Sequence, residues 1–439
     1  MNRVQAVLVA ASLAVAPAAG AACPPGNASV PAGANTADPA APFFIDTGGL
    51  DLATAPPTRD PANPRYPKAT ELADGQLPSP QQDGNFIIGP THAAAPETLA
   101  RPDVPRGAVR SFTLSSADSV IYRPGVIRDD AEGCHNAAIN AGATAAGDRS
   151  DLLVPASHPG AWTRQVDVYV PAQYVPGTEA PFIVFGDGSP AGFFKEAMLF
   201  AVLDALIQAR RLPPMVAIGI GAGGQDAQGS ERGREYDEVS GRYAEWVERE
   251  VLPRVEQDAR VRLTRDPDAR ATMGFSSSAA AAFTMAWFHP ELYHRVLGYS
   301  PTMVNQQWPH DPALPGGAWE YHGDWPGPRR PGLAAQGGAA TPSDASDGAP
   351  LIPNAARKPI RYWFEVGDRD LFYYVGALAD GMHDWVLANE EMAQVLAAKG
   401  YPYQFVFARN AAHVDNAVEA QTMAEALEWV WKDYPAPVQ

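Results

Sequence analysis

Downstream of residue 181, short apolar runs alternate with longer segments whose apolar residues recur at helical spacing. The short runs have the length and composition of strands buried on both faces. We expect strands at residues 182–185, 215–220, 295–299, 360–366 and 403–408, with another in the run that begins at Ala271. We expect helices at residues 199–207, 239–251, 383–398 and 417–431. Such alternation predicts a mostly parallel sheet covered by helices on both faces, an α/β fold.

The part of the chain before residue 181 has weaker patterns. Period-two alternation at residues 109–122 and 164–170 predicts half-buried antiparallel strands that open the sheet. The N-terminal region is rich in Pro, Ala, Gly and Asp and cannot bury enough surface for a core of its own. We expect it to be ordered only where apolar islands such as residues 86–88 dock. The predicted division is an extended arm at 22–106, one α/β domain at 107–437 and a low-complexity surface insertion at 325–350.

The first 21 residues have the order of a signal peptide. A positive charge at Arg3 precedes an apolar stretch at residues 7–15 and small residues at 19–21. We therefore expect export to the periplasm or secretion, with cleavage near Ala21. Cys23 raises the alternative of a lipid anchor, but a glycine stands where a lipobox has an aliphatic residue.

Charge and cysteine content restrict the partners and the redox state. The net charge of -17 argues against nucleic acid and anionic membranes as partners, because no basic block offsets the repulsion. No segment after the leader has the ~20 consecutive apolar residues of a membrane span, so we expect no stable membrane insertion. In an oxidising compartment, Cys23 and Cys134 either form one disulfide or remain two free thiols.

The run that begins at Ala271 also holds the first candidate for chemistry. Gly274 opens a G-x-S-x-S pattern centred on Ser276, one residue away from the G-x-S-x-G turn that exposes a nucleophilic serine in α/β-hydrolases. Small residues are needed there because the backbone is strained and a neighbouring strand passes closely. A Ser/Ala-rich helix start is the alternative interpretation.

Two later strand ends carry the other residue types that an activated serine requires. Asp370 follows the strand expected to end at residue 366, and His413 follows the last expected strand. Since the carboxyl ends of parallel strands share one edge, these loops should meet near Ser276. The order Ser, Asp, His is that of α/β-hydrolases. Asp368 is the alternative acid, and His383 is either a pocket residue or part of a helix start.

A tetrahedral intermediate also needs backbone donors for its oxyanion. The N–H of Ser277 follows the serine, and the loop opened by Asp187 and Gly188 suggests Ser189 as the second donor. Gly188 is accordingly a candidate pocket residue. We find no spacing typical of a metal site or a phosphate-binding loop, so we expect no metal and no cofactor.

With these residues in place, the chain resembles the putative-esterase family of α/β-hydrolases, and most closely an exported bacterial subgroup. The family includes enterochelin esterases, feruloyl and acetyl-xylan esterase-like proteins and mycolyltransferases. The resemblance extends over about residues 84–434, with specific stretches at 104–107, 168–174, 229–243, 286–291, 385–389 and 405–407.

By motif position, the resemblance implies that the family nucleophile, acid and base fall on Ser276, Asp370 and His413. Relatives usually read G-x-S-S-G-G, whereas this chain has Ser278 and Ala279 at the glycine positions. The insertion at residues 325–350 is also longer than the corresponding loop.

These observations predict an exported serine hydrolase that cleaves a small-molecule or glycan-linked carboxylic ester through an acyl-enzyme. Two alternatives remain open at the level of sequence. An acyltransferase would use a sugar or lipid hydroxyl in place of water. A catalytically impaired relative would only bind a ligand, an alternative suggested by the altered serine turn. The sequence leaves the acyl and alcohol specificity and the oligomeric state undetermined.

Overall fold

The structure is a computed structural model, and it describes residues 68–128, 157–188, 196–224, 229–306, 314, 316–323, 350–371 and 384–434. The expected signal peptide, both cysteines, Ser189, His383 and residues 325–349 of the expected insertion lie outside the described residues.

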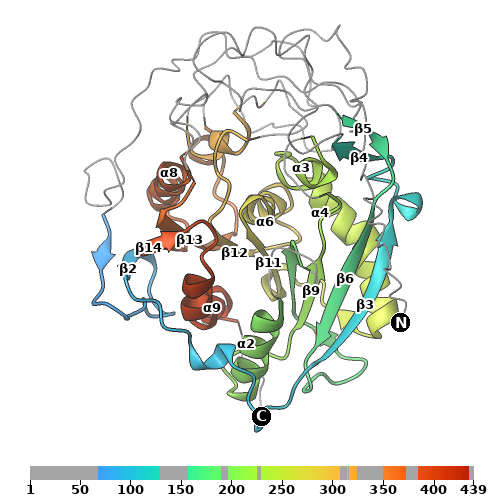
Figure 1. The fold of residues 1–439 in the computed structure, drawn as a ribbon, viewed down its shortest axis with the longest axis horizontal. Coiled ribbons are helices and arrows are strands. Elements are labelled where there is room, and N and C mark those ends of the chain that lie inside the picture. Colours follow the sequence, from blue (N-terminus) through green and yellow to red (C-terminus); the bar gives the residue numbers. More distant parts are fainter. Residues whose placement is uncertain are drawn as a thin grey trace, which may run out of the picture.

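A ten-stranded sheet forms the centre of the described part, in the order β1-β2-β14-β13-β12-β11-β8-β9-β6-β3 (Figure 1). Its strands are β1 (Thr70–Glu71), β2 (Gly84–Ile88), β3 (Ala108–Ser115), β6 (Thr163–Val170), β8 (Phe182–Gly186), β9 (Val216–Ile220), β11 (Arg270–Phe275), β12 (Arg295–Tyr299), β13 (Arg361–Arg369) and β14 (Tyr403–Ala412). Within this sheet, β6 runs antiparallel to β3 and β9, and the other neighbouring pairs are parallel. The predicted mostly parallel sheet with antiparallel opening strands is therefore confirmed.

Helices cover both faces of the sheet (Figure 1). The helices α2 (Glu196–Gln208) and α9 (Asn416–Trp431) lie on one face. The other face carries α3 (Glu231–Tyr236), α4 (Arg242–Trp246), α5 (Leu252–Ala259), α6 (Ser277–Phe288) and α8 (Trp385–Ala398). Strand β8 shows why both faces need cover. Phe182 and Val184 join one apolar cluster, whereas Ile183 and Phe185 join the other, because side chains alternate along a strand.

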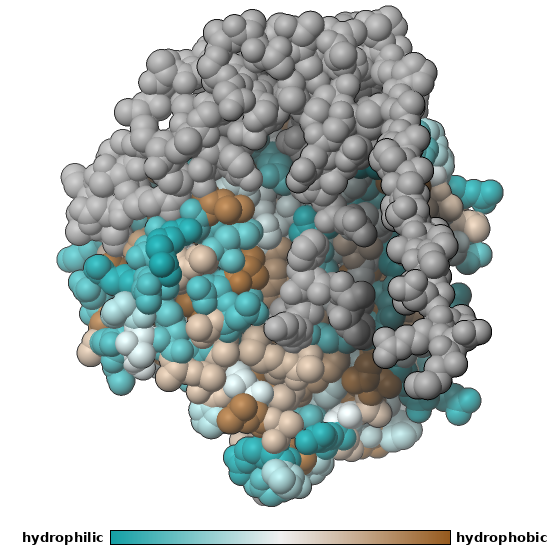
Figure 2. All heavy atoms as spheres, in the orientation of Figure 1, coloured by the Kyte–Doolittle hydropathy of each residue, from teal (hydrophilic) through white to brown (hydrophobic). Residues whose placement is uncertain are grey.

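Shorter elements complete the described residues. Two small sheets pair β4 (Gly125–Arg128) with β5 (Ser157–Gly160) and β7 (Glu179–Ala180) with β10 (Arg262–Leu263). Four short 3-10 helices are η1 (Pro96–Thr98), η2 (Ser116–Asp118), η5 (Pro267–Ala269) and η6 (Gly317–Tyr321), and α7 (Leu351–Asn354) is a short α-helix. On the face shown in Figure 2, hydrophobic residues form small separate areas among hydrophilic ones. The buried apolar side chains of the described residues form two clusters, one on each face of the sheet.

Two expected elements have different limits in the structure. The strand expected at residues 109–122 ends at Ser115, whose hydroxyl accepts the Ala117 N–H and turns the chain into η2. The helix expected at residues 239–251 is instead α4, a π-helical turn η4 (Val247–Val251) and α5. Pro253 accounts for the interruption, because its nitrogen cannot donate to the carbonyl four residues earlier.

Strands β13 and β14 are longer than the sequence predicted. The expected strand ends were residues 366 and 408, but the two strands pair as far as Arg369 and Ala412 across an irregularity between Gly367 and Arg369. This extension carries the chain directly to Asp370 and His413 at the carboxyl edge of the sheet.

Candidate active site

Ser276 occupies a sharp turn between β11 and α6. Its φ of 56° and ψ of −123° lie outside the regions that non-glycine residues favour, so the backbone is strained at this residue. Gly274 is required by the same turn, since a Cβ there would lie 2.1 Å from the Ser278 carbonyl carbon and oxygen. The G-x-S pattern therefore corresponds to a strand-to-helix turn that holds the Ser276 hydroxyl above the sheet.

Ser278 and Ala279, which stand at the family's glycine positions, are accommodated by glycines on the neighbouring strands. Gly186 of β8 faces the Ser278 side chain, and Gly298 of β12 faces the Ala279 methyl group. The Ser278 hydroxyl also accepts the Phe275 N–H and donates to the Phe275 carbonyl, both at 2.8 Å. The two substitutions are thus compatible with the turn.

The structure brings Ser276, His413 and Asp370 into one hydrogen-bonded chain. The Nε2 atom of His413 lies 2.9 Å from the Ser276 Oγ, and its Nδ1 atom lies 2.6 Å from the Asp370 Oδ1. A carboxylate only accepts, so Nδ1 carries the proton and Nε2 is the acceptor for the serine hydroxyl. The Asp370 side chain is fully buried, whereas that of His413 is 22% exposed.

Neighbouring groups hold the acid and the ring in place. The Ser300 hydroxyl donates to the Asp370 Oδ2 at 2.6 Å and accepts the Val414 N–H at 2.9 Å, so it links the two loops. The Leu371 N–H donates to the Asp370 Oδ1 at 2.6 Å. The Trp385 ring packs edge-on against His413, with centroids 5.8 Å apart. Our sequence reasoning missed Ser300, although its position directly after β12 was a usable signal.

Thr302 is a second contact that the sequence did not indicate. Its Oγ1 lies 3.3 Å from the Ser276 Oγ, and its N–H donates to the Ser276 carbonyl at 3.2 Å. Because Thr302 is buried, it limits the directions in which the Ser276 hydroxyl can point.

A second acid, Glu365, lies in β13 beneath the site. Complete burial raises the pKa of its carboxyl well above the usual range, and the nearby carboxylates of Asp370, Glu419 and Asp415 raise it further. Both of its carboxyl oxygens are buried without a hydrogen-bond partner among the described residues. Burial without a hydrogen-bond partner and beside other acids therefore favours the neutral form of the Glu365 carboxyl.

The structure describes three further candidate residues, namely Ser277, Gly188 and Asp368, and their polar groups have different partners. Ser277 begins α6, so its N–H is one of the first-turn donors that have no acceptor within the helix. The Gly188 N–H donates to the Ile220 carbonyl at 3.2 Å, and a Cβ on Gly188 would lie 2.6 Å from the Gly219 Cα. Asp368 accepts the Ala411 N–H at 3.1 Å. Of the two candidate acids, Asp370 is thus the one that contacts His413.

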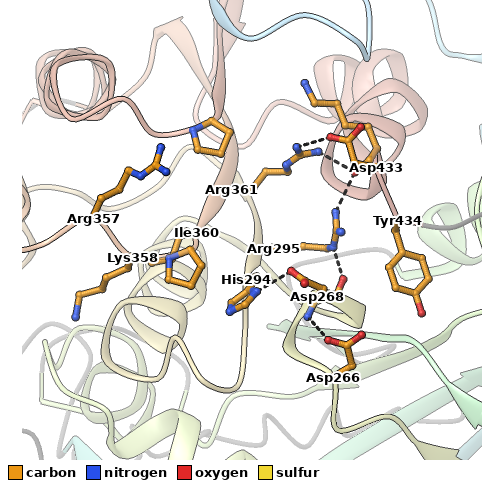
Figure 3. Close-up of a pocket in the computed structure, with 13 residues that line it drawn as sticks. Asp266, Asp268, His294, Arg295, Arg357, Lys358, Ile360, Arg361, Asp433 and Tyr434 are labelled. Atoms are coloured by element: carbon orange, nitrogen blue, oxygen red, sulfur yellow. Dashed lines mark hydrogen bonds and ion pairs between the residues drawn. The ribbon is translucent and has the colours of Figure 1, made fainter.

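A cavity of about 770 Å³ lies at the amino ends of β12 and β13, the edge of the sheet opposite Ser276 (Figure 3). The arginines that line it are engaged by the protein itself. Arg295 donates to the Asp268 carbonyl at 2.5 Å, and Arg361 donates to the carbonyls of Trp429 and Lys432 at the end of α9. The Arg361 bonds cap the C-terminus of α9, so we assign the cavity a structural role.

Within the described residues, neither a metal-binding cluster nor a membrane-spanning helix is present. No group of three or more His, Cys, Asp or Glu side chains there could hold a metal ion. No described helix is long and apolar enough to cross a bilayer.

The model of the family described as Putative esterase matches residues 157–403. No curated protein sequence matches the chain. Similar solved structures include a CE1 ferulic acid esterase from Anaeromyces mucronatus, at 13% identity and a TM-score of 0.44, covering 77% of this chain and 96% of that one.

Two further structures are similar to the chain. The feruloyl esterase module from Clostridium thermocellum, complexed with sinapinate, has 12% identity and a TM-score of 0.43, covering 83% of this chain and 99% of that one. The enterochelin esterase from Shigella flexneri has 19% identity and a TM-score of 0.40, covering 62% of this chain and 55% of that one.

Proposed function

The chain belongs to the family described as Putative esterase and is an esterase with the α/β-hydrolase fold, and from this premise we propose that it cleaves carboxylic esters through a covalent acyl-enzyme formed on Ser276. In this proposal His413 is the general base and acid, and Asp370 orients its ring. The observation that carries it is the hydrogen-bonded chain from Ser276 through His413 to Asp370, with contacts of 2.9 and 2.6 Å.

Acylation begins when the Ser276 Oγ attacks the ester carbonyl carbon and its proton passes to the His413 Nε2. The Asp370 carboxylate stabilises the imidazolium that forms and keeps the second ring proton on Nδ1. The Ser277 N–H is the proposed donor to the oxyanion of the tetrahedral intermediate. When the intermediate collapses, the bond to the alcohol oxygen breaks and His413 returns the proton to the leaving alkoxide.

Deacylation repeats these steps with water as the nucleophile. His413 takes a proton from the water, whose oxygen attacks the acyl carbon, and then returns a proton to the Ser276 oxygen as the acid leaves. The free enzyme is restored without any change of oxidation state. The partly exposed His413 ring is consistent with access for this water.

The test is hydrolysis of short-chain aryl esters by the purified protein and by Ser276→Ala. Turnover should fall on the order of 10⁶-fold in the variant, because the activated nucleophile is removed. The Ser276→Ala protein must retain the wild-type thermal transition for the comparison to count. Hydrolysis at the wild-type rate in this variant would show that Ser276 is not the nucleophile.

The substrate class and the location remain proposals. We propose a small-molecule or glycan-linked ester as substrate, since the similar structures are of ferulic acid, feruloyl and enterochelin esterases. We also propose export, on the basis of the leader at residues 1–21, which lies outside the described residues. Mass measurement of the protein expressed in a bacterium should find a mature N-terminus near Ala22, and a retained leader would contradict export.

A further inference from the structure

Helix α3 contacts the end of β8 through a buried ion pair. The Arg232 Nε and a terminal nitrogen each donate to one carboxylate oxygen of Asp187, both at 2.9 Å. Both side chains are almost completely buried. A bidentate ion pair between a planar guanidinium and a carboxylate fixes the relative orientation of the two groups as well as their distance. Arg232 thus determines the position of the residue that directly follows β8.

The backbone of Asp187 depends on this support. Its φ of 57° lies in the left-handed region, which non-glycine residues rarely adopt. Its N–H donates to the Tyr236 hydroxyl of α3 at 3.1 Å. A Cβ on Gly186, the preceding residue, would lie 2.6 Å from the Ser278 Cβ and 3.0 Å from the Tyr236 hydroxyl oxygen. The strained end of β8 is therefore held between α3 and the nucleophile helix α6.

Asp237, the residue after α3, is connected through Gln306 to Ser277, the residue after the candidate nucleophile. The Gln306 amide nitrogen donates to the Asp237 Oδ2 at 3.1 Å and to the Ser277 Oγ at 3.4 Å. Asp237 is the C-cap residue of α3. One short helix and its cap are therefore connected both to the end of β8 and to the residue after the nucleophile.

We propose that α3 is a clamp that sets the end of β8 relative to the Ser276–Ser277 turn, with Arg232 as its principal positioning residue. In α/β-hydrolases the oxyanion lies between the N–H after the nucleophile and the chain that leaves this strand. Removing an oxyanion donor costs 10²- to 10³-fold in turnover, and small displacements cost a sizeable part of that. This inference rests on the proposed serine hydrolase function and adds a residue that does not touch the substrate.

Arg234 provides a matched control within the same helix. It is also an arginine with a buried side chain, but it donates to the Pro124 carbonyl and pairs with Glu231 at 3.7 Å, away from β8. Arg232→Gln and Arg234→Gln therefore both remove a buried guanidinium from α3. Only the first removes the contact to Asp187.

The experiment measures kcat, KM and the thermal transition of both variants with an aryl ester, together with inhibition by a boronic acid that mimics the tetrahedral intermediate. Arg232→Gln should lower kcat and kcat/KM about equally, by roughly 10- to 100-fold, and weaken the boronate by a similar factor. Arg234→Gln should keep kcat within about threefold of wild type. Arg232→Lys keeps the charge but not the bidentate contact, so its kcat and boronate affinity should lie between those of Arg232→Gln and Arg234→Gln.

Equal kcat and boronate affinity in the two glutamine variants would overturn the clamp. If Arg232→Gln does not fold, Arg232→Lys and Asp187→Asn take its place with the same direction expected. Ser276→Ala separates the two hypotheses. If Ser276→Ala abolishes hydrolysis while the Arg232 variants match Arg234→Gln, the clamp proposal fails and the serine mechanism stands. If Ser276→Ala retains hydrolysis at the wild-type rate, both the serine mechanism and the clamp proposal fail.

Discussion

Ser276 and Ser278 lie two residues apart in one turn but have separable roles. The Ser276 hydroxyl points to His413, whereas the Ser278 hydroxyl bonds to the backbone of Phe275 inside the turn. In this chain the serine at a family glycine position therefore adds two hydrogen bonds to a strained segment. The Ser278 side chain fits the turn because Gly186 on the adjacent strand leaves the space.

Ser278→Ala should lower the free energy of unfolding by about 1–3 kcal/mol, because the buried Phe275 N–H and carbonyl lose this partner. Chemical denaturation checks the value. Ser276→Ala is the control in the same turn, since it should abolish hydrolysis without a comparable loss of stability. Equal unfolding midpoints for Ser278→Ala and wild type would show that the hydroxyl does not support the turn.

At the scale of elements, the strands with continuous apolar runs and the loops after β13 and β14 could be predicted from sequence. Each is encoded locally, by apolar runs or by a polar residue at a strand end. The apolar island at residues 86–88 was expected to dock, but its pairing with β14 as strand β2 could not be predicted, because β14 lies about 320 residues further along the chain and nothing local specifies that pairing. The Asp187–Arg232 pair was missed for a related reason, since a contact between a strand end and a side chain of a helix some 45 residues later has no sequence period.

Strand β2 also makes the N-terminal segment part of the fold. Ile88 is 1% exposed and belongs to the apolar cluster beneath α9 and α2, so Ile88→Ala should destabilise the protein by about 2–5 kcal/mol. Leu99→Ala is the control, because Leu99 is 67% exposed and its truncation should change the free energy of unfolding by less than about 0.5 kcal/mol. Similar unfolding curves for the two variants would mean that β2 contributes little to stability.

On the scale of the whole molecule, several acids are buried in a protein of net charge -17. Burial, followed by the nearby Asp167 carboxylate, raises the pKa of Glu196 to about 8. Glu365 is shifted in the same direction by burial and by its acidic neighbours. A carboxyl with a raised folded-state pKa binds more protons in the folded state than in the unfolded state, so stability falls as pH rises above about 4.5.

Stability should accordingly decrease between about pH 5 and pH 8, and Glu365→Gln should reduce that decrease. Glutamine resembles the neutral acid at every pH. As pH increases from 5 to 8, the free energy of unfolding of the variant, minus that of wild type, should therefore increase by up to about 1.4 kcal/mol per pH unit. Thermal or chemical unfolding at pH 5, 6.5 and 8 measures the difference. A stability difference between variant and wild type that does not change with pH would indicate that Glu365 is ionised in the fold.

The central claim is that Ser276 is activated by His413 and Asp370 as one unit. The most direct measurement is reaction with a fluorophosphonate, followed by intact-mass analysis and peptide mapping of the adduct. The account predicts one equivalent of label on Ser276, none in Ser276→Ala, and labelling of His413→Ala slowed by orders of magnitude. Label on another residue, or equally fast labelling of His413→Ala and wild type, would contradict it.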